Sequence, residues 1–293
     1  MNNAIEILGL VKKYPRFQLG PLDLTVPRGA IYGLIGPNGA GKTTAIDLIF
    51  GLGENDAGQI RVLGLDHRAD AVSLKRRAGY VGPDLNFQVW GKIGKVIRFV
   101  RGFYPEWDDG YCGALMKAFH LSDGDRVATL SFGAKTKLSL LLALAHRPEI
   151  LILDEPFTGL DAISKQQVFG ELLKAVKDGE RTVLISSHGL SDIERFADHV
   201  GMLKEGKLLL EGRTDEVVER YRLAEFFSST VTGFESCAGL NILKRSENRW
   251  QALLDQQSGA QEWLQTRGAE QISLTRLTLE DLFVSLFKEE EAE

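Results

Sequence analysis

The segment AIYGLIGPNGAGKTTAIDLIF, residues Ala30–Phe50, joins an apolar strand, a glycine-rich loop and a helical repeat, and this combination decides the fold. Its centre, GPNGAGKT (Gly36–Thr43), fits the pattern G-x-x-x-x-G-K-[ST] between a strand and a helix. The glycines let the backbone curve so that successive amides face the β- and γ-phosphates of a nucleotide. Lys42 adds a positive charge there, and the Thr43 hydroxyl can ligate Mg²⁺. The alternative, a chance glycine-rich turn, is disfavoured by the position between strand and helix.

Two acidic residues follow a second apolar run later in the chain. The run ILILDE, Ile150–Glu155, is a continuous apolar strand of the kind that lies inside a parallel sheet. Open α/β sheets bind ligands at the carboxyl ends of their strands, where Asp154 and Glu155 fall. We expect Asp154 to hold Mg²⁺ through water, and Glu155 to accept a proton from the attacking water as general base. The alternative is that both acids only cap the next element.

Strands and helices alternate along most of the chain, which predicts an α/β fold with a parallel sheet. Helical spacing marks an insertion at about residues 83–147, and a hairpin is expected to turn at Glu205 and Gly206. The nucleotide-binding domain is therefore expected to span residues 1–222.

The remaining residues, 223–293, are expected to form a small α+β domain of short strands and helices. One of its strands is expected within Glu225–Phe234. The aromatic residues Phe226, Phe227 and Trp250 are expected in its core, because large aromatic side chains are mostly buried.

Composition limits the classes of function. The 293 residues are 44% hydrophobic and 26% charged, which is ordinary for a globular protein of about two domains. The net charge of -5 argues against a general nucleic-acid binder. Cys112 and Cys237 match no metal-ligand spacing, so we expect reduced thiols in a cytosolic protein. No signal-peptide pattern is present, and the longest apolar run, Leu138–Ala145, is shorter than the roughly 20 residues of a membrane span. We expect a soluble protein whose membrane role would come through a partner.

Five motifs carry a resemblance to a known family: GPNGAGKTT, LSFGAK, ILILDEP, TGLD and SSH occur in that family's order. From about Ala4 to Tyr221 the chain resembles the ATP-binding subunit of ABC transporters. Its tail is similar to the accessory C-terminal segment of the subfamily that serves ABC-2 type exporters. The resemblance implies a P-loop NTPase of the ABC cassette type, with a parallel sheet core, an antiparallel β subdomain and a helical insertion, followed by a small α+β C-terminal domain.

The resemblance also implies which residues contact ATP. Tyr14, in VKKYP, matches the aromatic residue that stacks on adenine, an interaction worth roughly 1–3 kcal/mol. The alternative for Tyr14 is an ordinary tyrosine packed in the core at a strand edge. The phosphate-loop residues implied to contact ATP are Gly36, Pro37, Asn38, Gly39, Ala40, Gly41, Lys42, Thr43 and Thr44.

In this family the phosphate loop of one copy faces the signature loop of a second copy. Residues Leu130–Ala134 match the Leu-Ser-Gly-Gly-Gln signature, with Ser131 and Gly133 kept, while Phe132 replaces a glycine and Ala134 the glutamine. Ser131 and the amide of Gly133 are implied to contact the γ-phosphate held by the partner. We expect the Phe132 side chain to point away from the nucleotide, into the helical insertion or the dimer seam. Ser131 as a simple helix cap is the alternative.

Two further positions match single residues of the family pattern. His188, after the strand TVLISS, matches the switch histidine that bonds the γ-phosphate and positions Glu155. Asp161, in TGLD, matches the loop that crosses to the other subunit. The alternatives are a surface histidine and an ordinary helix cap.

The chain departs from the family after the strand GYVGPD. A glutamine that ligates Mg²⁺ usually follows this strand, and here Pro83 or Asp84 takes its place. Pro83 has no ligand atom. Asp84 is a hard oxygen ligand suited to Mg²⁺, or equally a turn residue.

The resemblance implies an ATPase subunit with ATP and Mg²⁺ as cofactors. Two copies, or one copy and a paralogous ATPase subunit, would pair on ATP and drive a separate transmembrane permease, with export expected and no nucleic-acid partner. The chain would then be cytoplasmic and peripheral on the inner face of the cell membrane.

Two other functions stay open. A soluble ABC ATPase acting on DNA, ribosomes or cofactor assembly is disfavoured, because only one cassette is present and neither long coiled coils nor zinc-binding cysteines occur. A regulatory subunit that holds ATP without hydrolysis is disfavoured by Glu155 and His188, and favoured by Phe132 and the missing glutamine.

Overall fold

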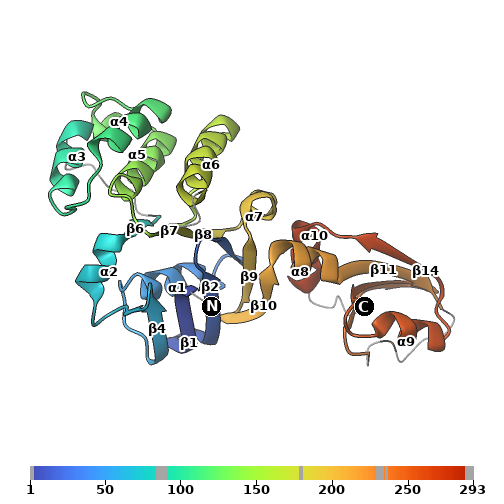
Figure 1. The fold of residues 1–293 in the computed structure, drawn as a ribbon. Helices are drawn as coiled ribbons and strands as arrows, with labels where there is room; N and C mark the ends of the chain where they lie inside the picture. Colours follow the sequence, from blue (N-terminus) through green and yellow to red (C-terminus); the bar gives the residue numbers. More distant parts are fainter. Residues whose placement is uncertain (1–2, 84–90, 178–180, 229–233, 235–236, 288–293) are drawn as a thin grey trace. The chain divides into compact units, whose positions relative to one another are not determined.

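Residues 3–83, 91–177, 181–228, 234 and 237–287 are described by the structure, a computed structural model drawn in Figure 1. The chain divides into two compact units, which are Met1–His188 with Ala197–Leu210, and Gly189–Phe196 with Glu211–Glu293. The boundary expected between residues 222 and 223 lies inside the second unit. The reason is that two helices, α7 (Leu190–Phe196) and α8 (Thr214–Arg220), pack with tail elements.

A six-stranded sheet forms the centre of the first unit. Its strands are, in spatial order, β10 (Lys207–Arg213), β9 (His199–Lys204), β3 (Ile31–Ile35), β8 (Thr182–Ser187), β7 (Ile150–Asp154) and β6 (Ala78–Val81). The pairs from β9 to β6 are all parallel. β3, β7 and β8 are buried along their whole length, which is why each reads as a nearly continuous apolar run. The α/β class expected from the sequence is confirmed.

An antiparallel sheet packs on this centre through the helix that follows the phosphate loop. Its order is β2 (Phe17–Pro27), β1 (Asn3–Tyr14), β4 (Ala57–Val62) and β5 (Leu65–Asp66). The helix α1 (Lys42–Ile49) contacts both β4 and β7, so it lies between the two sheets. Ile7, Ile46 and Ile152, from β1, α1 and β7, belong to one buried cluster. The start of α1 is thus fixed by packing on both sides.

In its described residues, the expected insertion between β6 and β7 contains the α-helices α3 (Ile93–Arg101), α4 (Asp109–Ala118) and α5 (Phe132–Leu144) (Figure 1). The last of these lies directly on β6. A β-carbon on Gly79 would overlap the carbonyl oxygen of Ala143, so any side chain at that position would push α5 off the sheet. Two further helices, α2 (Ala71–Arg77) and α6 (Ala162–Val176), flank the same strands, and α6 packs on β8.

The tail sheet has the order β12 (Leu240–Ser246), β13 (Arg249–Asp255), β11 (Tyr221–Phe227) and β14 (Glu270–Arg276), with helices α9 (Ala260–Thr266) and α10 (Leu279–Phe287). Phe226, Phe234 and Trp250 are buried together in its core, with ring centroids of Phe234 and Trp250 5.1 Å apart. This confirms the expected α+β class of the tail.

Two expectations for the tail were wrong in detail. Phe227 is 43% exposed, because side chains alternate along β11 and its neighbour Phe226 takes the core face. The strand expected within Glu225–Phe234 begins earlier, at Tyr221, and ends at Phe227. Residues 229–233 lie outside the described residues.

The hairpin turn at Glu205 and Gly206 is confirmed, and both residues have positive φ angles, as such tight turns require.

Both cysteines are free. Burial raises the pKa of the Cys112 thiol to about 11, so this thiol is protonated and unreactive at neutral pH.

A charged pair ties the end of α2 to the start of β7. Nη2 of Arg77 donates to Oε2 of Glu149 at 2.7 Å, and this bond lowers the pKa of Glu149 from its ordinary value of 4.5. Both side chains are more than a third exposed, so we expect Arg77→Met to lower the free energy of unfolding by only about 0.5–1 kcal/mol at pH 7.

The pH dependence separates lost charge pairing from lost packing. Because the pKa of Glu149 is lowered in the folded state, the pair contributes fully above pH 4.5 and its contribution is lost as the pH falls through the lowered pKa. Urea unfolding of Arg77→Met and wild type from pH 7 to pH 3.5 should show converging stabilities. A difference that stays constant over this range would contradict the prediction.

Candidate functional site

The phosphate loop follows β3 and ends at α1. Gly39 and Gly41 have φ angles of 81° and 106°, which residues with side chains rarely adopt. Lys42 is only 6% exposed and folds back over the loop. Its Nζ donates to the carbonyl oxygens of Gly36 at 2.7 Å and Pro37 at 3.2 Å. Backbone oxygens therefore hold the lysine at the place where the sequence predicts a triphosphate.

The other residues expected to contact ATP lie on the same loop or at the end of β1. Thr44 is half-buried on the first turn of α1 and Ala40 is buried, while Pro37, Asn38, Gly39 and Thr43 are exposed. Tyr14, the last residue of β1, is 48% exposed rather than packed in the core. Its ring stacks on the ring of Phe17, with the two ring centroids 6.4 Å apart.

Phe17 links Tyr14 to the phosphate loop. A β-carbon on Gly41 would lie 2.9 Å from Cζ of Phe17, so the ring lies directly against the loop backbone. Phe17 was not predicted from the sequence. Its signal was a second aromatic residue just across the turn from Tyr14.

Ser186 connects the two acidic residues at the end of β7. Its hydroxyl donates to Oδ1 of Asp154 and accepts the backbone N–H of Glu155 at 2.9 Å. Asp154 is 1% exposed, and its second oxygen, Oδ2, has no hydrogen-bond partner among the described residues. Glu155 has a φ angle of 50°, an unfavourable backbone conformation for a residue with a side chain. Such strain persists only where neighbouring contacts maintain it, and it is common at active sites.

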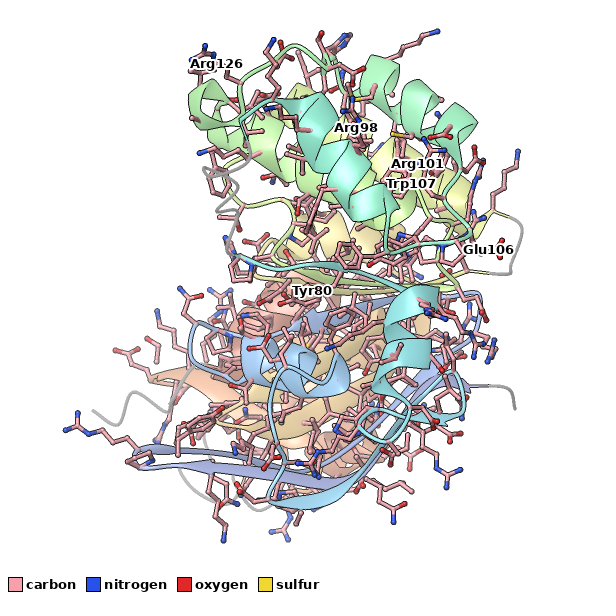
Figure 2. All side chains as sticks on the ribbon, turned by 90° about the vertical axis from the view of Figure 1, so that its left-hand side faces the viewer. Tyr80, Arg98, Arg101, Glu106, Trp107 and Arg126 are labelled. Atoms are coloured by element: carbon pink, nitrogen blue, oxygen red, sulfur yellow. The ribbon has the colours of Figure 1, made fainter. Side chains whose placement is uncertain are left out.

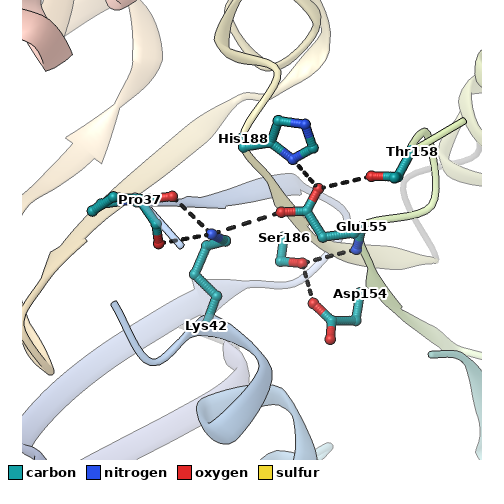
Figure 3. Close-up of polar contacts among 8 residues, drawn as sticks. Pro37, Lys42, Asp154, Glu155, Thr158, Ser186 and His188 are labelled. Atoms are coloured by element: carbon teal, nitrogen blue, oxygen red, sulfur yellow. Dashed lines mark hydrogen bonds and ion pairs between the residues drawn. The ribbon is translucent and has the colours of Figure 1, made fainter. Parts of the chain in front are cut away.

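The Glu155 carboxylate is the meeting point of three parts of the fold (Figure 3). Its Oε2 lies 2.7 Å from Nδ1 of His188 and accepts the Thr158 hydroxyl at 3.3 Å. Its Oε1 lies 3.6 Å from Nζ of Lys42. The structure thus brings together Lys42, Asp154, Glu155 and His188, which are separated by up to 146 positions in the chain. Thr158 and Ser186 were not predicted, although Thr158 belongs to the quoted TGLD stretch and Ser186 to the quoted SSH stretch.

The positions of Asp154 and Thr43 fit the Mg²⁺ site expected from the sequence. An uncompensated, buried carboxylate oxygen is costly unless a cation or water satisfies it, and Oδ2 of Asp154 is such an atom. The Thr43 hydroxyl is exposed on the first turn of α1. Among the described residues no group of three acidic, histidine or cysteine side chains is placed to hold a metal. Mg²⁺ suits this arrangement, because it is commonly held by one or two protein oxygens together with phosphate. Asp84 lies outside the described residues.

A third carboxyl group, that of Asp47, lies close enough to Asp154 to interact with it electrostatically. Burial raises the pKa of the Asp47 carboxyl, and the nearby Asp154 raises it further, while a hydrogen bond from the Tyr80 hydroxyl opposes both effects. A cation bound by Asp154 would relieve this concentration of acidic groups.

The signature residues line a cleft of about 450 Å³ at the start of α5, together with Gly159 and Asp161. Ser131 is exposed and caps α5, its hydroxyl accepting the Ala134 N–H at 3.2 Å. Gly133 is half-buried, so neither residue is enclosed by its own chain. Phe132 is 50% exposed, and its ring lies against Gly159, a contact that the sequence did not predict.

Asp161 caps α6, since its carboxylate accepts the Ser164 N–H at 2.8 Å. This bond lowers the pKa of the Asp161 carboxyl from its ordinary value of 3.8. A helix cap is the alternative role expected for Asp161 from the sequence. The residue also lines the cleft, so a partner can still reach it.

Comparison with known proteins agrees with this geometry. A protein-family model described as ABC transporter matches residues 19–158. The daunorubicin resistance ATP-binding protein DrrA3 of Streptomyces coeruleorubidus is 30% identical over 97% of this chain and 96% of its own length. The Nod factor export ATP-binding protein I of Rhizobium johnstonii is 33% identical over 74% of this chain and 71% of its own length. A solved ATP-binding subunit of an ABC transporter superimposes with a TM-score of 0.68 at 26% identity, covering 74% of this chain and 92% of its own.

The chain belongs to the ABC transporter family. It is an ATP-binding subunit of that family and an ATPase, and the predicted cassette fold is confirmed. Among the helices that the structure describes, none combines the length and the apolar character needed to cross a membrane.

We expect Lys42→Ala to raise the dissociation constant of the ABC ATPase for ATP at least about tenfold, equivalent to about 1.4 kcal/mol. The variant removes the only charge that the phosphate loop itself supplies. Titration with a fluorescent ATP analogue measures the constant. Lys207→Ala, which removes an exposed lysine on β10, is the matched control. Equal affinities of Lys42→Ala and wild type would remove the phosphate-loop assignment.

Proposed function

We propose that two copies of this ATPase pair face to face, enclose two ATP molecules with Mg²⁺, and drive a separate transmembrane permease. The observation that carries the proposal is the distribution of groups in one chain. The base Glu155 is held by Lys42 and His188, whereas Ser131 lines a separate exposed cleft. A single chain therefore presents both halves of a composite site, and a two-fold pair would complete each half.

The reaction proposed is attack of water on the γ-phosphate. Lys42 and the loop amides would bind the phosphates, and Mg²⁺, held by Asp154 and Thr43, would neutralise their charge. Glu155 would accept the proton of the attacking water at its carboxylate. His188 would orient that carboxylate through the 2.7 Å contact at Oε2. Ser131 and Gly133 of the second copy would close the site over the γ-phosphate and exclude bulk water.

Arrival of ATP would also release the base. In the structure Nζ of Lys42 is shared between two loop carbonyls and the Glu155 carboxylate. A γ-phosphate beside Lys42 would compete for the same ammonium group, which leaves Glu155 bonded to Thr158 and His188. The carboxylate would then be free to contact water only when substrate is present.

Glu155→Gln tests the pairing. Glutamine keeps the size of the side chain but cannot accept the proton, so we expect hydrolysis to fall by about 10²-fold or more. ATP should then persist and hold the pair together. Size exclusion with light scattering in MgATP should give twice the 32.4 kDa mass of one chain.

The combined variant Glu155→Gln with Lys42→Ala, which should bind ATP at least about tenfold more weakly, is the control and should need correspondingly more MgATP to pair. A strictly monomeric Glu155→Gln in saturating MgATP would sink the proposed sandwich.

We propose the helical insertion as the surface that docks the permease. Phe99 and Phe103 are 48% and 62% exposed and lie edge to face with ring centroids 5.1 Å apart. The exposed side of α3 also carries basic residues, and Arg98 and Arg101 lie on the outer surface of the insertion (Figure 2). Arg101 is already paired with Asp109, its Nη2 2.7 Å from Oδ2, so Arg98 is the residue of the two that we expect to meet an acidic partner. Exposed aromatic pairs with flanking positive charge are typical of protein interfaces, and they suit an acidic, amphipathic segment of a partner. The relative named for Nod factor export supports an exporting partner.

Phe99→Ser with Phe103→Ser should reduce membrane association. The chain would be produced together with a candidate transmembrane permease, and its share in the washed membrane fraction would be measured. We expect this share to fall at least twofold, because the apolar contact is lost. Val72→Ser removes an apolar side chain that is 70% exposed on α2, and serves as the control. An unchanged share, or an equal loss with Val72→Ser, would rule out this surface.

A further inference from the structure

Phe132 stands where the family pattern has a glycine, and its ring makes one defined contact. A β-carbon on Gly159 would lie 2.8 Å from Cδ1 and 3.0 Å from Cε1 of Phe132, so the ring lies on the Gly159 backbone. Gly159 has a φ angle of 71°, and any side chain there would meet both this strain and the ring. Beside it, a β-carbon on Gly133 would lie 3.2 Å from Cδ2 of Leu160. The start of α5 and the TGLD turn therefore interdigitate over two adjacent residues.

The turn under the ring is bonded to the catalytic base. The N–H of Thr158 donates to the Glu155 carbonyl at 3.2 Å, and its hydroxyl donates to Oε2 of Glu155 at 3.3 Å. The N–H of Leu160 donates to the carbonyl of Phe157 at 3.2 Å. Phe157 in turn stacks on Phe169 of α6 with ring centroids 4.0 Å apart. One end of the turn is thus anchored to α6, while its exposed side is covered by Phe132.

We infer that Phe132 is a positioning residue for Glu155, acting through Gly159 and Thr158. The ring limits how far the Gly159 backbone can move, and Thr158, the preceding residue, keeps its hydroxyl on the base. The inference rests on the proposed function. If Ser131 and Gly133 close on the partner's nucleotide, the same helix start reports that closure to Glu155 of its own site. A glycine at position 132 would lack the side chain that makes this connection.

The two sites of the pair would then be coupled within each chain. The path is short and made of contacts: the start of α5, the ring of Phe132, the backbone of Gly159, the hydroxyl of Thr158 and the carboxylate of Glu155. Because packed side chains transmit displacement where they are in van der Waals contact, a shift of the helix start moves the turn. Coupling through such a path is a claim that double-mutant cycles can test.

Steady-state hydrolysis by the full chain tests this role. Phe132→Ala should lower kcat at least fivefold with KM for ATP changed less than twofold, because the base is misplaced while the phosphate loop is intact. Phe132→Leu, which keeps apolar bulk on Gly159, should retain at least half of the wild-type kcat. Thr158→Val, which keeps the shape but removes the hydroxyl, should match the loss of Phe132→Ala.

The double variant decides whether the two residues act in series. Phe132→Ala combined with Thr158→Val should have nearly the kcat of either single variant, since both break the same connection. Losses that multiply would show independent roles and overturn the inference. A wild-type kcat for Phe132→Ala would do so as well.

Two further measurements separate positioning from folding and from pairing. Gly159→Ala should lower the midpoint of thermal unfolding, and adding Phe132→Ala should restore part of it, because the methyl group no longer meets the ring; no restoration would count against the contact. In the Glu155→Gln background, Phe132→Ala should still form the ATP-dependent dimer. Loss of that dimer would make Phe132 an interface residue instead, whereas failure of Glu155→Gln alone to dimerise would refute the proposed function.

Discussion

Burial of adjacent parallel strands on both faces is the constraint on which the site depends. β3, β8 and β7 are neighbours in the sheet, and each is buried along its length. Because parallel strands end at one edge, the phosphate loop after β3, Glu155 after β7 and His188 after β8 arrive at the same place. The packing of α1 between two sheets then fixes the first of these loops. The chemistry therefore rests on hydrophobic contacts away from the reacting atoms.

The Glu155 carboxylate at this edge is held in place although the backbone conformation of its residue is unfavourable. Glu155 has a positive φ, and its amide and carboxylate are held by Ser186, Thr158, His188 and Lys42, from three separate elements. Positive φ costs on the order of 1–3 kcal/mol for a residue with a side chain, so these bonds are needed to keep the carboxylate in place. In the proposed function, each partner is also a point through which a substrate or a neighbouring loop would shift this carboxylate.

The signature cleft and the base belong to one packed region, although the proposed pairing assigns them to different nucleotides. Phe132 and Leu160 interdigitate with the backbones of Gly159 and Gly133. The replacement of a family glycine by phenylalanine is thus accommodated by a glycine across the contact, at which no larger residue fits. The departure from the family pattern has a structural counterpart in the same chain, which argues against a degenerate signature.

Local pattern in the sequence predicted the α/β class, the phosphate loop, the acidic strand end and the small tail domain. These features depend on strand burial, helix periodicity and loop glycines, which are visible in residues that are neighbours in the chain. Phe227 was misplaced because both faces of β11 carry an aromatic residue and local pattern does not choose between them. Local pattern also did not predict the hydrogen bonds of Ser186 and Thr158 or the contact of Phe132 with Gly159. Such contacts join residues distant in the chain through particular rotamers, and only the packing of helices on the finished sheet decides which atoms meet.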